Sequence, residues 1–314
     1  MRRRPLGKTG LRVTELALGT WGLSGDGYGP VTEMEQELVI ERARAVGIRL
    51  FDTADSYAHG AMERRLGARL GKDETALIVT RIGTDRDHPI PRKRFDVEFL
   101  RAAFDGCRER LGRDVLDVVL LHNPSTATLE AGHATGLMSE LVSTGKLTAW
   151  GASVGSVDAG RAALGRGAQV LSLPYNVFHQ TDFIDLGDEL ERHEAGVLAH
   201  SALAYGLLCG HWSADKIFPD FDHRSERWTG DELRRRVRQL DAVRPLVGGP
   251  VASLRAAALR FVLSNERIAS CAIGPRSTLQ LDQLVREAGR EPPYFADGKL
   301  TALRNRLRDV GVPA

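Results

Sequence analysis

Polar and titratable side chains stand at the ends of several short apolar runs in this sequence. Asp52, Arg81 and His122 each lie at or near the end of such a run, and Tyr57 follows the first of them after a short gap. If the runs are neighbouring strands of one sheet, an acid, a phenol, a cation and an imidazole would point into one pocket. Such a set could hold or transfer a proton. Each residue alone would more often be a satisfied polar group at a strand end.

Eight apolar runs of this kind, rich in Val, Ile and Leu, recur along the chain. They cover residues 15–20, 49–54, 76–83, 115–123, 147–155, 170–176, 197–203 and 270–275. Helical patterns alternate with them at 31–47, 61–71, 92–112, 128–145, 156–165, 187–196, 231–248 and 277–289. Continuous apolar runs are typical of strands buried on both faces of a parallel sheet. Strict alternation over a chain of this length predicts an α/β fold, a closed (β/α)₈ TIM barrel.

A doubly wound open sheet is the competing architecture. It would more often carry a G-x-G-x-x-G segment after a strand, and the sequence has none. The first segment, with Thr9 and Gly10 between two short runs, predicts an N-terminal β-hairpin that plugs the barrel. Residues 253–265 and 295–309 are expected to be extra C-terminal helices. Residues 1–314 are expected to form one barrel domain, with its site at the carboxyl ends of the strands.

Composition excludes several classes of protein. The 43 Lys and Arg residues against 41 Asp and Glu give a net charge of +2, which argues against a nucleic-acid binder that relies on bulk charge. Cys107, Cys209 and Cys271 are widely spaced, so neither a metal site nor a disulfide framework is indicated. No run of 18 apolar residues and no signal core occurs, and we expect a cytoplasmic protein without membrane or nucleic-acid partners.

Six sequence motifs resemble those of the aldo-keto reductases, in the same order and spacing over nearly the whole chain. They are PLGKTGLRVTELALGTWG, LFDTADSY, ALIVTRIG, VVLLHNP, LPYN and IGPRS. The resemblance implies a TIM barrel that transfers a hydride between NADPH and a carbonyl compound without a metal. The substrate would be an aldehyde or ketone, such as a sugar or a natural-product intermediate.

The resemblance assigns catalytic roles to four residues. Asp52 matches the family's catalytic aspartate, Tyr57 its proton-donating tyrosine and His122 its histidine. Arg81 occupies the position of the family's lysine. Tyr57 would protonate the carbonyl oxygen, and a neighbouring cation would make its hydroxyl more acidic. Asp52 would hold that cation, and His122 would orient the substrate oxygen.

The resemblance also implies a cofactor site. Ser153 matches a contact to the nicotinamide carboxamide, Ser172 stands where a glutamine is usual, and His200 replaces the ring that stacks on the nicotinamide. Arg276 lies before a helix, where free N–H groups and its own fork would bind the 2′-phosphate of NADP. The remaining positions assigned to the cofactor are Gly19, Thr20, Trp21, Ser201, Leu203, Gly206, Gly274, Ser277 and Gln280.

Two alternatives remain open at this level. Arg81 would fork onto Asp52 and leave Tyr57 less perturbed, which suits an NADPH-binding protein with weak or non-standard catalysis. Ser153 also lies in a G-x-S-x-G segment between a strand and a helix, the context of a serine hydrolase nucleophile. His193 or His200 would then be the base. No HGGG-type segment precedes that serine, and the eightfold alternation is left unexplained.

Overall fold

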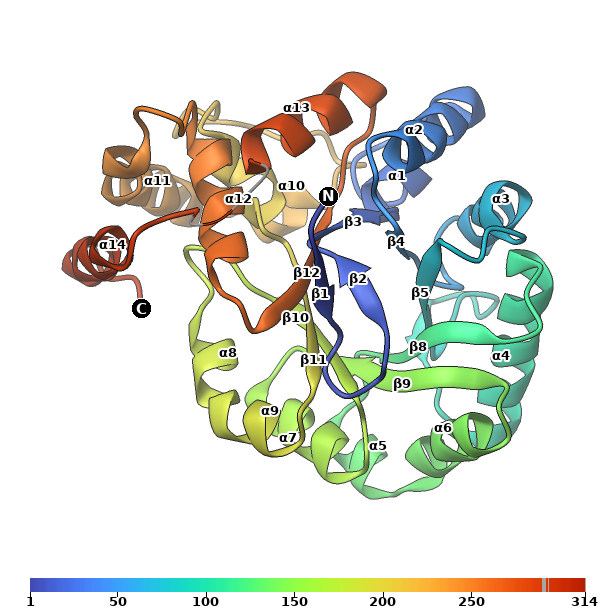
Figure 1. Ribbon diagram of the computed structural model, residues 1–314. Coiled ribbons are helices and arrows are strands. Elements are labelled where there is room, and N and C mark those ends of the chain that lie inside the picture. Colours follow the sequence, from blue (N-terminus) through green and yellow to red (C-terminus); the bar gives the residue numbers. More distant parts are fainter. Residues whose placement is uncertain (290–291, 293, 314) are drawn as a thin grey trace.

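Eight parallel strands close into a barrel in the computed structural model, which describes residues 1–289, 292 and 294–313 (Figure 1). Around the ring the strands follow the order β10, β11, β12, β3, β4, β5, β8 and β9. Their bounds are β3 Leu16–Gly19, β4 Leu50–Asp52, β5 Leu77–Ile82, β8 Leu116–His122, β9 Leu147–Ser153, β10 Val170–Pro174, β11 Gly196–His200 and β12 Ile268–Ile273. Each predicted run contains one of these strands, or the greater part of one, so the predicted TIM barrel is confirmed.

Helices surround the barrel and connect successive strands (Figure 1). The α-helices are α1 Trp21–Ser24, α2 Glu33–Ala45, α3 Ala61–Leu70, α4 Val97–Leu111, α5 Thr126–Glu130, α6 His133–Ser143, α7 Val157–Gly165, α8 Thr181–Asp185, α9 Gly187–Arg192, α10 Arg224–Arg227, α11 Gly230–Gln239, α12 Leu254–Ser264, α13 Thr278–Ala288 and α14 Asp297–Asp309. Three 3₁₀ segments are η1 Ala204–Cys209, η2 Leu240–Ala242 and η3 Arg244–Leu246. Within the described residues, no helix has the length and apolar character needed to cross a membrane.

Side chains along each strand alternate between the barrel interior and the helix layer. Leu50 and Val79 belong to the inner cluster of buried residues, whereas Phe51 and Ile78 belong to the outer cluster beneath the helices. This period of two follows from the pleat of the strands. The inner cluster is apolar and forms what we call the apolar floor. The next inward side chains toward the carboxyl ends of the strands lie on top of it.

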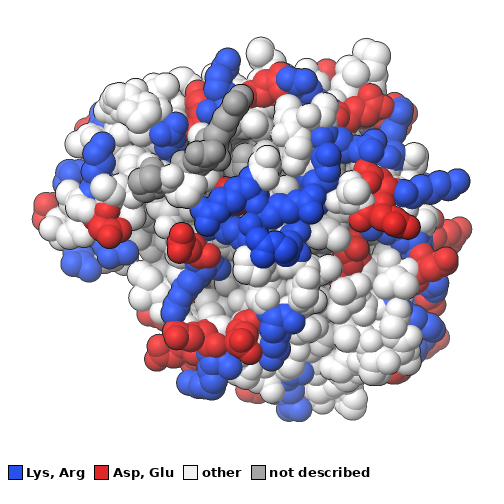
Figure 2. Space-filling view, in the orientation of Figure 1, with Lys and Arg blue, Asp and Glu red and all other residues white. Residues whose placement is uncertain are grey.

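The N-terminal hairpin plugs the opposite end of the barrel, as predicted. Strands β1 (Arg3–Pro5) and β2 (Arg12–Thr14) pair antiparallel and lie across the barrel (Figure 1). Leu6 and Val13 are fully buried and join the inner cluster. Figure 2 shows Lys and Arg side chains gathered in the middle of the same face, which the hairpin crosses in Figure 1.

Arg4 fastens this hairpin to the last part of the barrel. Its Nε donates to Glu15 Oε1 at 2.7 Å, and its other nitrogens donate to the carbonyls of Leu263 at 2.6 Å and Ile268 at 2.8 Å. Tyr294 donates to the second oxygen of Glu15 at 2.6 Å. All of these side chains are buried, so the first and last described parts of the chain share one polar cluster.

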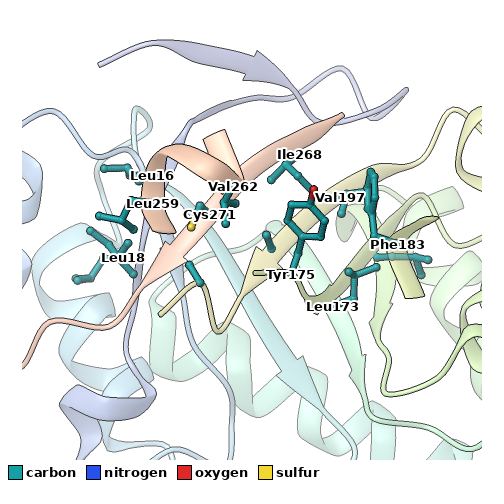
Figure 3. Close-up of a cluster of buried hydrophobic side chains, with 14 of the residues drawn as sticks. Leu16, Leu18, Leu173, Tyr175, Phe183, Val197, Leu259, Val262, Ile268 and Cys271 are labelled. Carbon is teal, nitrogen blue, oxygen red and sulfur yellow. The ribbon is translucent and has the colours of Figure 1, made fainter. Parts of the chain in front are cut away.

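The helix that covers β12 is α12, which was expected to be an extra helix. Eight of its residues are buried, and Figure 3 shows Leu259 and Val262 beside Cys271 of β12. The segment 231–248, expected to be this barrel helix, instead forms α11, η2 and η3. Helix α11 of this segment is rich in charged residues and has few that can be buried. Helix α12 is apolar on nearly every side and therefore packs on the barrel.

Two further predicted helices differ in extent. The pattern at 128–145 is split into α5 and α6 by Gly132, which has a φ of 84° and ends the first of them. The pattern at 92–112 becomes helical only at Val97, because Asp96 caps it by accepting from Phe99 N. The residues before the cap form strand β7 (Arg92–Lys93), which pairs with β6 (Thr84–Asp85).

Candidate active site

A layer of polar side chains caps the apolar floor at the carboxyl ends of the strands. Asp52 lies two residues after Leu50 and Arg81 two residues after Val79, so both share the inward parity of those core residues. His122, Ser153, Ser172 and His200 also lie at or near the carboxyl ends of their strands. The barrel therefore gathers side chains that are far apart in the sequence.

Asp52 and Arg81 form the centre of this layer. The two terminal guanidinium nitrogens donate to the two carboxylate oxygens of Asp52, each at 2.8 Å. The same nitrogens also donate to the carbonyl of Thr53 at 2.8 Å and to Ser172 Oγ at 3.2 Å. Arg81 is only 4% exposed and Asp52 8%. A planar fork held at four acceptors is rigid and keeps its charge.

Tyr57 lies beside this pair, with its ring edge-on to the ring of His122 at a centroid distance of 6.4 Å. Burial raises the pKa of the Tyr57 hydroxyl to about 12, although the Arg81 cation acts to lower it. The Asp52 carboxylate, which neutralises much of that cation, acts to raise it. The expected net acidification by the cation is thus not found in this structure, and Tyr57 stays protonated at neutral pH.

The chain after Tyr57 turns sharply through residues of left-handed conformation. Ala58, His59 and Gly60 have φ values of 46°, 49° and 77°. Asp26 supports this turn, because its Oδ2 accepts from the Ala58 N–H at 2.8 Å. Left-handed conformation at two non-glycine residues is costly and concentrates at functional sites. Here it returns the chain to the helix layer directly after Tyr57.

His122 is a buried, neutral imidazole. Burial and the nearby cations Lys93 and Arg81 hold its pKa well below the ordinary value. Its Nδ1 lies 3.2 Å from Thr84 Oγ1, on the short strand β6. His200, across the barrel, is neutral for the same reason, because burial lowers its pKa to about 3.

Two residues near this layer were not singled out from the sequence. Lys93 of β7 is an exposed residue whose ammonium group donates to Thr84 Oγ1 at 2.8 Å, and partial burial of that group lowers its pKa to about 8. Burial, with a contribution from the Glu63 carboxylate, raises the pKa of Asp55 to about 7. Asp55 Oδ1 is buried and has no hydrogen-bond partner among the described residues.

Ser153 is bound to its neighbour Asn123. Its hydroxyl donates to Asn123 Oδ1 at 3.0 Å and accepts from the Asn123 N–H at 3.1 Å. Neither His193 nor His200 is a partner of Ser153 in the described part of the chain; the His200 ring contacts Ser201 Oγ at 3.0 Å. The pairing of serine with a histidine base that a serine hydrolase needs is therefore missing.

The loop before α13 lies apart from this layer, against the loop after α1 and helix α2. Ser277 caps α13 by accepting from Gln280 N at 3.2 Å, while Arg276 N donates to Gln280 Oε1 at 2.8 Å. The next free amide, Thr278 N, donates to the carboxylate of Glu35 at 3.0 Å. A carboxylate thus already sits at the helix N-terminus where a phosphate was expected.

The guanidinium of Arg276 is folded onto backbone carbonyls. Its Nη2 donates to the carbonyl of Gly29 at 2.9 Å and to that of Pro30 at 3.0 Å. Its Nε is buried and has no hydrogen-bond partner among the described residues. An anion at this loop would satisfy that N–H, so the residue suits a phosphate once its fork is released.

The other predicted cofactor residues fall into two groups. At the end of β3, an added side chain on Gly19 would lie 3.2 Å from the carbonyl of Ile273, and the Thr20 hydroxyl donates to the carbonyl of Asp52 at 2.9 Å. The Trp21 ring lies 4.6 Å from that of His223. In the second group, Leu203 and Gly206 lie at the two ends of a turn of left-handed conformation after β11. Gly274 lies in the loop that follows β12.

A parallel barrel with a polar layer at the carboxyl ends of its strands is the architecture of TIM-barrel enzymes. The family model of the aldo/keto reductase family matches residues 15–290, which is most of the chain. The chain therefore belongs to the aldo/keto reductase family, whose members are oxidoreductases that use nicotinamide cofactors. Among the described residues, no cluster of His, Cys, Asp and Glu side chains could hold a metal ion.

Known relatives are similar over nearly their full length. A pyridoxal 4-dehydrogenase of Microbacterium luteolum is 26% identical over an alignment of 323 positions, which covers 90% of this chain and 92% of that protein. The structure of a glycerol dehydrogenase of Gluconobacter oxydans has a TM-score of 0.86 at 24% identity, with coverage of 99% and 97%. An aldo-keto reductase of Bacillus halodurans in its holo form has a TM-score of 0.80 at 18% identity, with coverage of 100% and 97%.

Proposed function

We propose that this protein reduces an aldehyde or ketone with NADPH, with Tyr57 as the proton donor. The observation that supports it most directly is the placement of Tyr57, His122 and the Asp52–Arg81 pair in one layer above an apolar floor. The protein would act as a soluble cytoplasmic enzyme on a small molecule. An aromatic aldehyde, or the carbonyl product of a polyol, suits the substrates named for its relatives.

Each residue of the layer has a separate role in the proposed carbonyl reduction. The bound nicotinamide supplies the hydride that adds to the carbonyl carbon. Tyr57, protonated at neutral pH, gives its hydroxyl proton to the carbonyl oxygen, so that an alcohol forms and a tyrosinate remains. Arg81 stabilises that tyrosinate by its charge, and Asp52 keeps the guanidinium in place. His122 orients the oxygen with one of its ring nitrogens.

The residues around the strand ends fit a nicotinamide nucleotide. Ser153, Ser172 and His200 line the mouth near Arg81, where the nicotinamide would bind. The turn from Leu203 to Gly206 would pass the pyrophosphate. Gly274, Arg276, Ser277 and Gln280 would hold the adenosine end, where Arg276 Nε, without a hydrogen-bond partner among the described residues, would bind an anion. Gly19, Thr20 and Trp21 would complete the site beside β3.

The test of this proposal is the Tyr57→Phe variant. We expect kcat/KM for carbonyl reduction to fall by about 10²–10⁴-fold, because the ring is kept while the proton donor is lost. Binding of NADPH, followed by fluorescence titration, should be unchanged. A Tyr175→Phe variant serves as the control, since Tyr175 donates no proton at the site and lies among buried residues outside the barrel. Full activity of Tyr57→Phe would remove Tyr57 from the mechanism.

A second outcome would favour a binding role. Tyr57 with a pKa of about 12 is a weak acid, which suits a protein that binds NADPH and turns over slowly. Tight NADPH binding without oxidation across a broad panel of aldehydes and ketones would support that alternative.

A further inference from the structure

The short hairpin β6–β7 places two side chains behind His122. Thr84 of β6 pairs with Lys93 of β7, so the hairpin brings residues nine positions apart into register. Lys93 Nζ lies 2.8 Å from Thr84 Oγ1, and Thr84 Oγ1 lies 3.2 Å from His122 Nδ1. The three side chains therefore form one hydrogen-bonded chain that ends at the imidazole.

The chemistry of the three groups fixes the direction of this chain. A lysine ammonium can only donate, so Lys93 occupies one acceptor site of the Thr84 oxygen. The Thr84 proton then needs an acceptor, and among the described residues Thr84 Oγ1 has no hydrogen-bond partner besides Lys93 and His122. A hydroxyl that accepts from a cation is also polarised into a stronger donor. This arrangement lets Thr84 donate to His122 Nδ1.

We propose that Lys93 and Thr84 are positioning residues that fix the proton of neutral His122 on Nε2, so that the ring presents a donor to the substrate oxygen. The proposal deepens the reductase function and rests on it. A neutral imidazole has one donor and one acceptor, so an O–H···N hydrogen bond from the Thr84 hydroxyl to Nδ1 leaves the proton on Nε2. His122 Nε2 has no hydrogen-bond partner in the described residues and is available to donate to a ligand.

Burial and the charges on the surrounding elements keep His122 in this neutral form. Arg81 faces it from β5, Lys93 from β7 and Arg86 from the hairpin loop, and these three cations disfavour an imidazolium, while His200 of β11 is itself neutral. Removing Lys93 would both break the hydrogen-bonded chain and remove one of these charges. The lost charge raises the pKa of His122.

The tautomer of His122 is the first measurement. We would record long-range ¹H–¹⁵N correlation spectra of protein labelled at histidine, with a His122→Asn variant to identify the signals. The wild type should show His122 protonated at Nε2. Thr84→Val should shift it toward Nδ1 protonation or a mixture, and Thr84→Ser should restore the wild-type pattern. An unchanged tautomer in folded Thr84→Val would overturn the proposal.

Activity with Lys93 variants is the second measurement. Lys93→Met should lower kcat/KM by about tenfold or more, and the acid limb of its pH profile should move to higher pH. Lys93→Arg keeps a cationic donor and should retain most activity, while Lys299→Met on distant α14 should change nothing. Equal activity of Lys93→Met and Lys93→Arg would contradict the inference. A wild type that reduces no carbonyl compound would refute only the reductase function, because the tautomer is read without turnover.

Discussion

At the scale of single residues, the most consequential feature is the guanidinium of Arg81. Its four hydrogen bonds use two nitrogens against two carboxylate oxygens, a carbonyl and a hydroxyl. An ammonium has three donors and cannot reproduce a planar fork. The site is therefore built around arginine, and lysine at this position would be a change of geometry with the charge retained.

The first prediction follows for Arg81→Lys. We expect the free energy of unfolding to fall by about 2–3 kcal/mol, since at least one charged hydrogen bond to Asp52, Thr53 or Ser172 is lost in a buried setting. The measurement is urea unfolding together with kcat/KM, which should also fall. Arg69→Lys is the matched control, because Arg69 forks onto exposed carboxylates on the helix surface. Unchanged stability of Arg81→Lys would show that the fork contributes little.

The second prediction concerns the buried carboxyl of Asp55. Its pKa of about 7 in the folded protein exceeds the unfolded value near 4, so the folded state binds the extra proton between these limits. Protonated Asp55 therefore stabilises the folded protein at low pH, and this contribution is lost as the pH rises toward 7. Asp55→Asn should remove this loss, with a gain over wild type that is larger at pH 8 than at pH 5.

The size of that gain is bounded by the linkage relation. The difference between variant and wild type can grow by at most about 1.4 kcal/mol per pH unit between pH 5 and 7. Urea unfolding at both pH values measures it, and the exposed Asp114→Asn serves as the control. A gain that is independent of pH would mean that Asp55 is ionised throughout this range.

Sequence patterns identified part of this site and missed the rest for a physical reason. Asp52, Arg81 and His122 could be predicted because each ends or nearly ends a recognisable buried strand. Their shared inward parity with core residues such as Leu50 was also present in the sequence as a spacing of two. Lys93 and Thr84 gave no such signal, since their hairpin consists of two polar two-residue strands without apolar alternation.

At the scale of elements, the contact between α2 and α13 affects what the loop before α13, proposed to hold the adenosine end of the cofactor, can bind. Glu35 of α2 places its carboxylate on the amide of Thr278, in the field of the α13 N-terminus. A 2′-phosphate brought to Arg276 and Ser277 would meet this negative charge. The fold therefore sets an acidic residue of one helix against the predicted phosphate site of another.

The third prediction is that Glu35→Gln tightens NADPH binding relative to NADH. Removing a like charge a few ångströms from the phosphate is worth on the order of 1 kcal/mol, or about a fivefold change in the ratio of Kd values. Arg276→Ala should move the ratio the other way. Glu33→Gln, two residues earlier and paired with Arg65 on the surface, is the control. An unchanged ratio for both variants would place the phosphate elsewhere or exclude NADPH as the preferred cofactor.

Most strands could be predicted from the sequence, while several helix assignments could not. Parallel strands buried on both faces are continuous apolar runs, and this signal does not depend on tertiary detail. Helix assignment between β11 and β12 failed because both 231–248 and 253–265 carry helical patterns. Only the packing of α12 on β12 decides which of them covers the barrel.

At the scale of the whole molecule, the apolar floor separates the hairpin plug from the polar layer. Leu6 of the plug is fully buried among inward residues such as Leu50, Val79 and Val118, and it contributes no polar atom to the site. The plug and the proposed active site thus lie at opposite ends of the barrel, as is usual for this fold.

The fourth prediction tests that division with Leu6→Ala. The variant should lose about 2–5 kcal/mol of unfolding free energy, because a buried side chain is replaced by a cavity. Its kcat/KM, measured per folded molecule at low temperature, should match the wild type. Leu11→Ala, at a partly buried position of the same hairpin, should cost less. A large loss of activity at full folding would show that the plug reaches the site.

The cluster around Arg4 bears on how the chain is made. Arg4 leaves the ribosome well before the carbonyls it binds, which belong to residues 259–264 positions later. At typical rates of translation, on the order of tens of seconds separate the two. The hairpin cannot make these contacts until α12 and β12 have emerged, so closure of this end of the barrel must follow their synthesis. Until then, Leu6 and Val13 cannot be buried in the complete inner cluster to which they belong in the folded barrel.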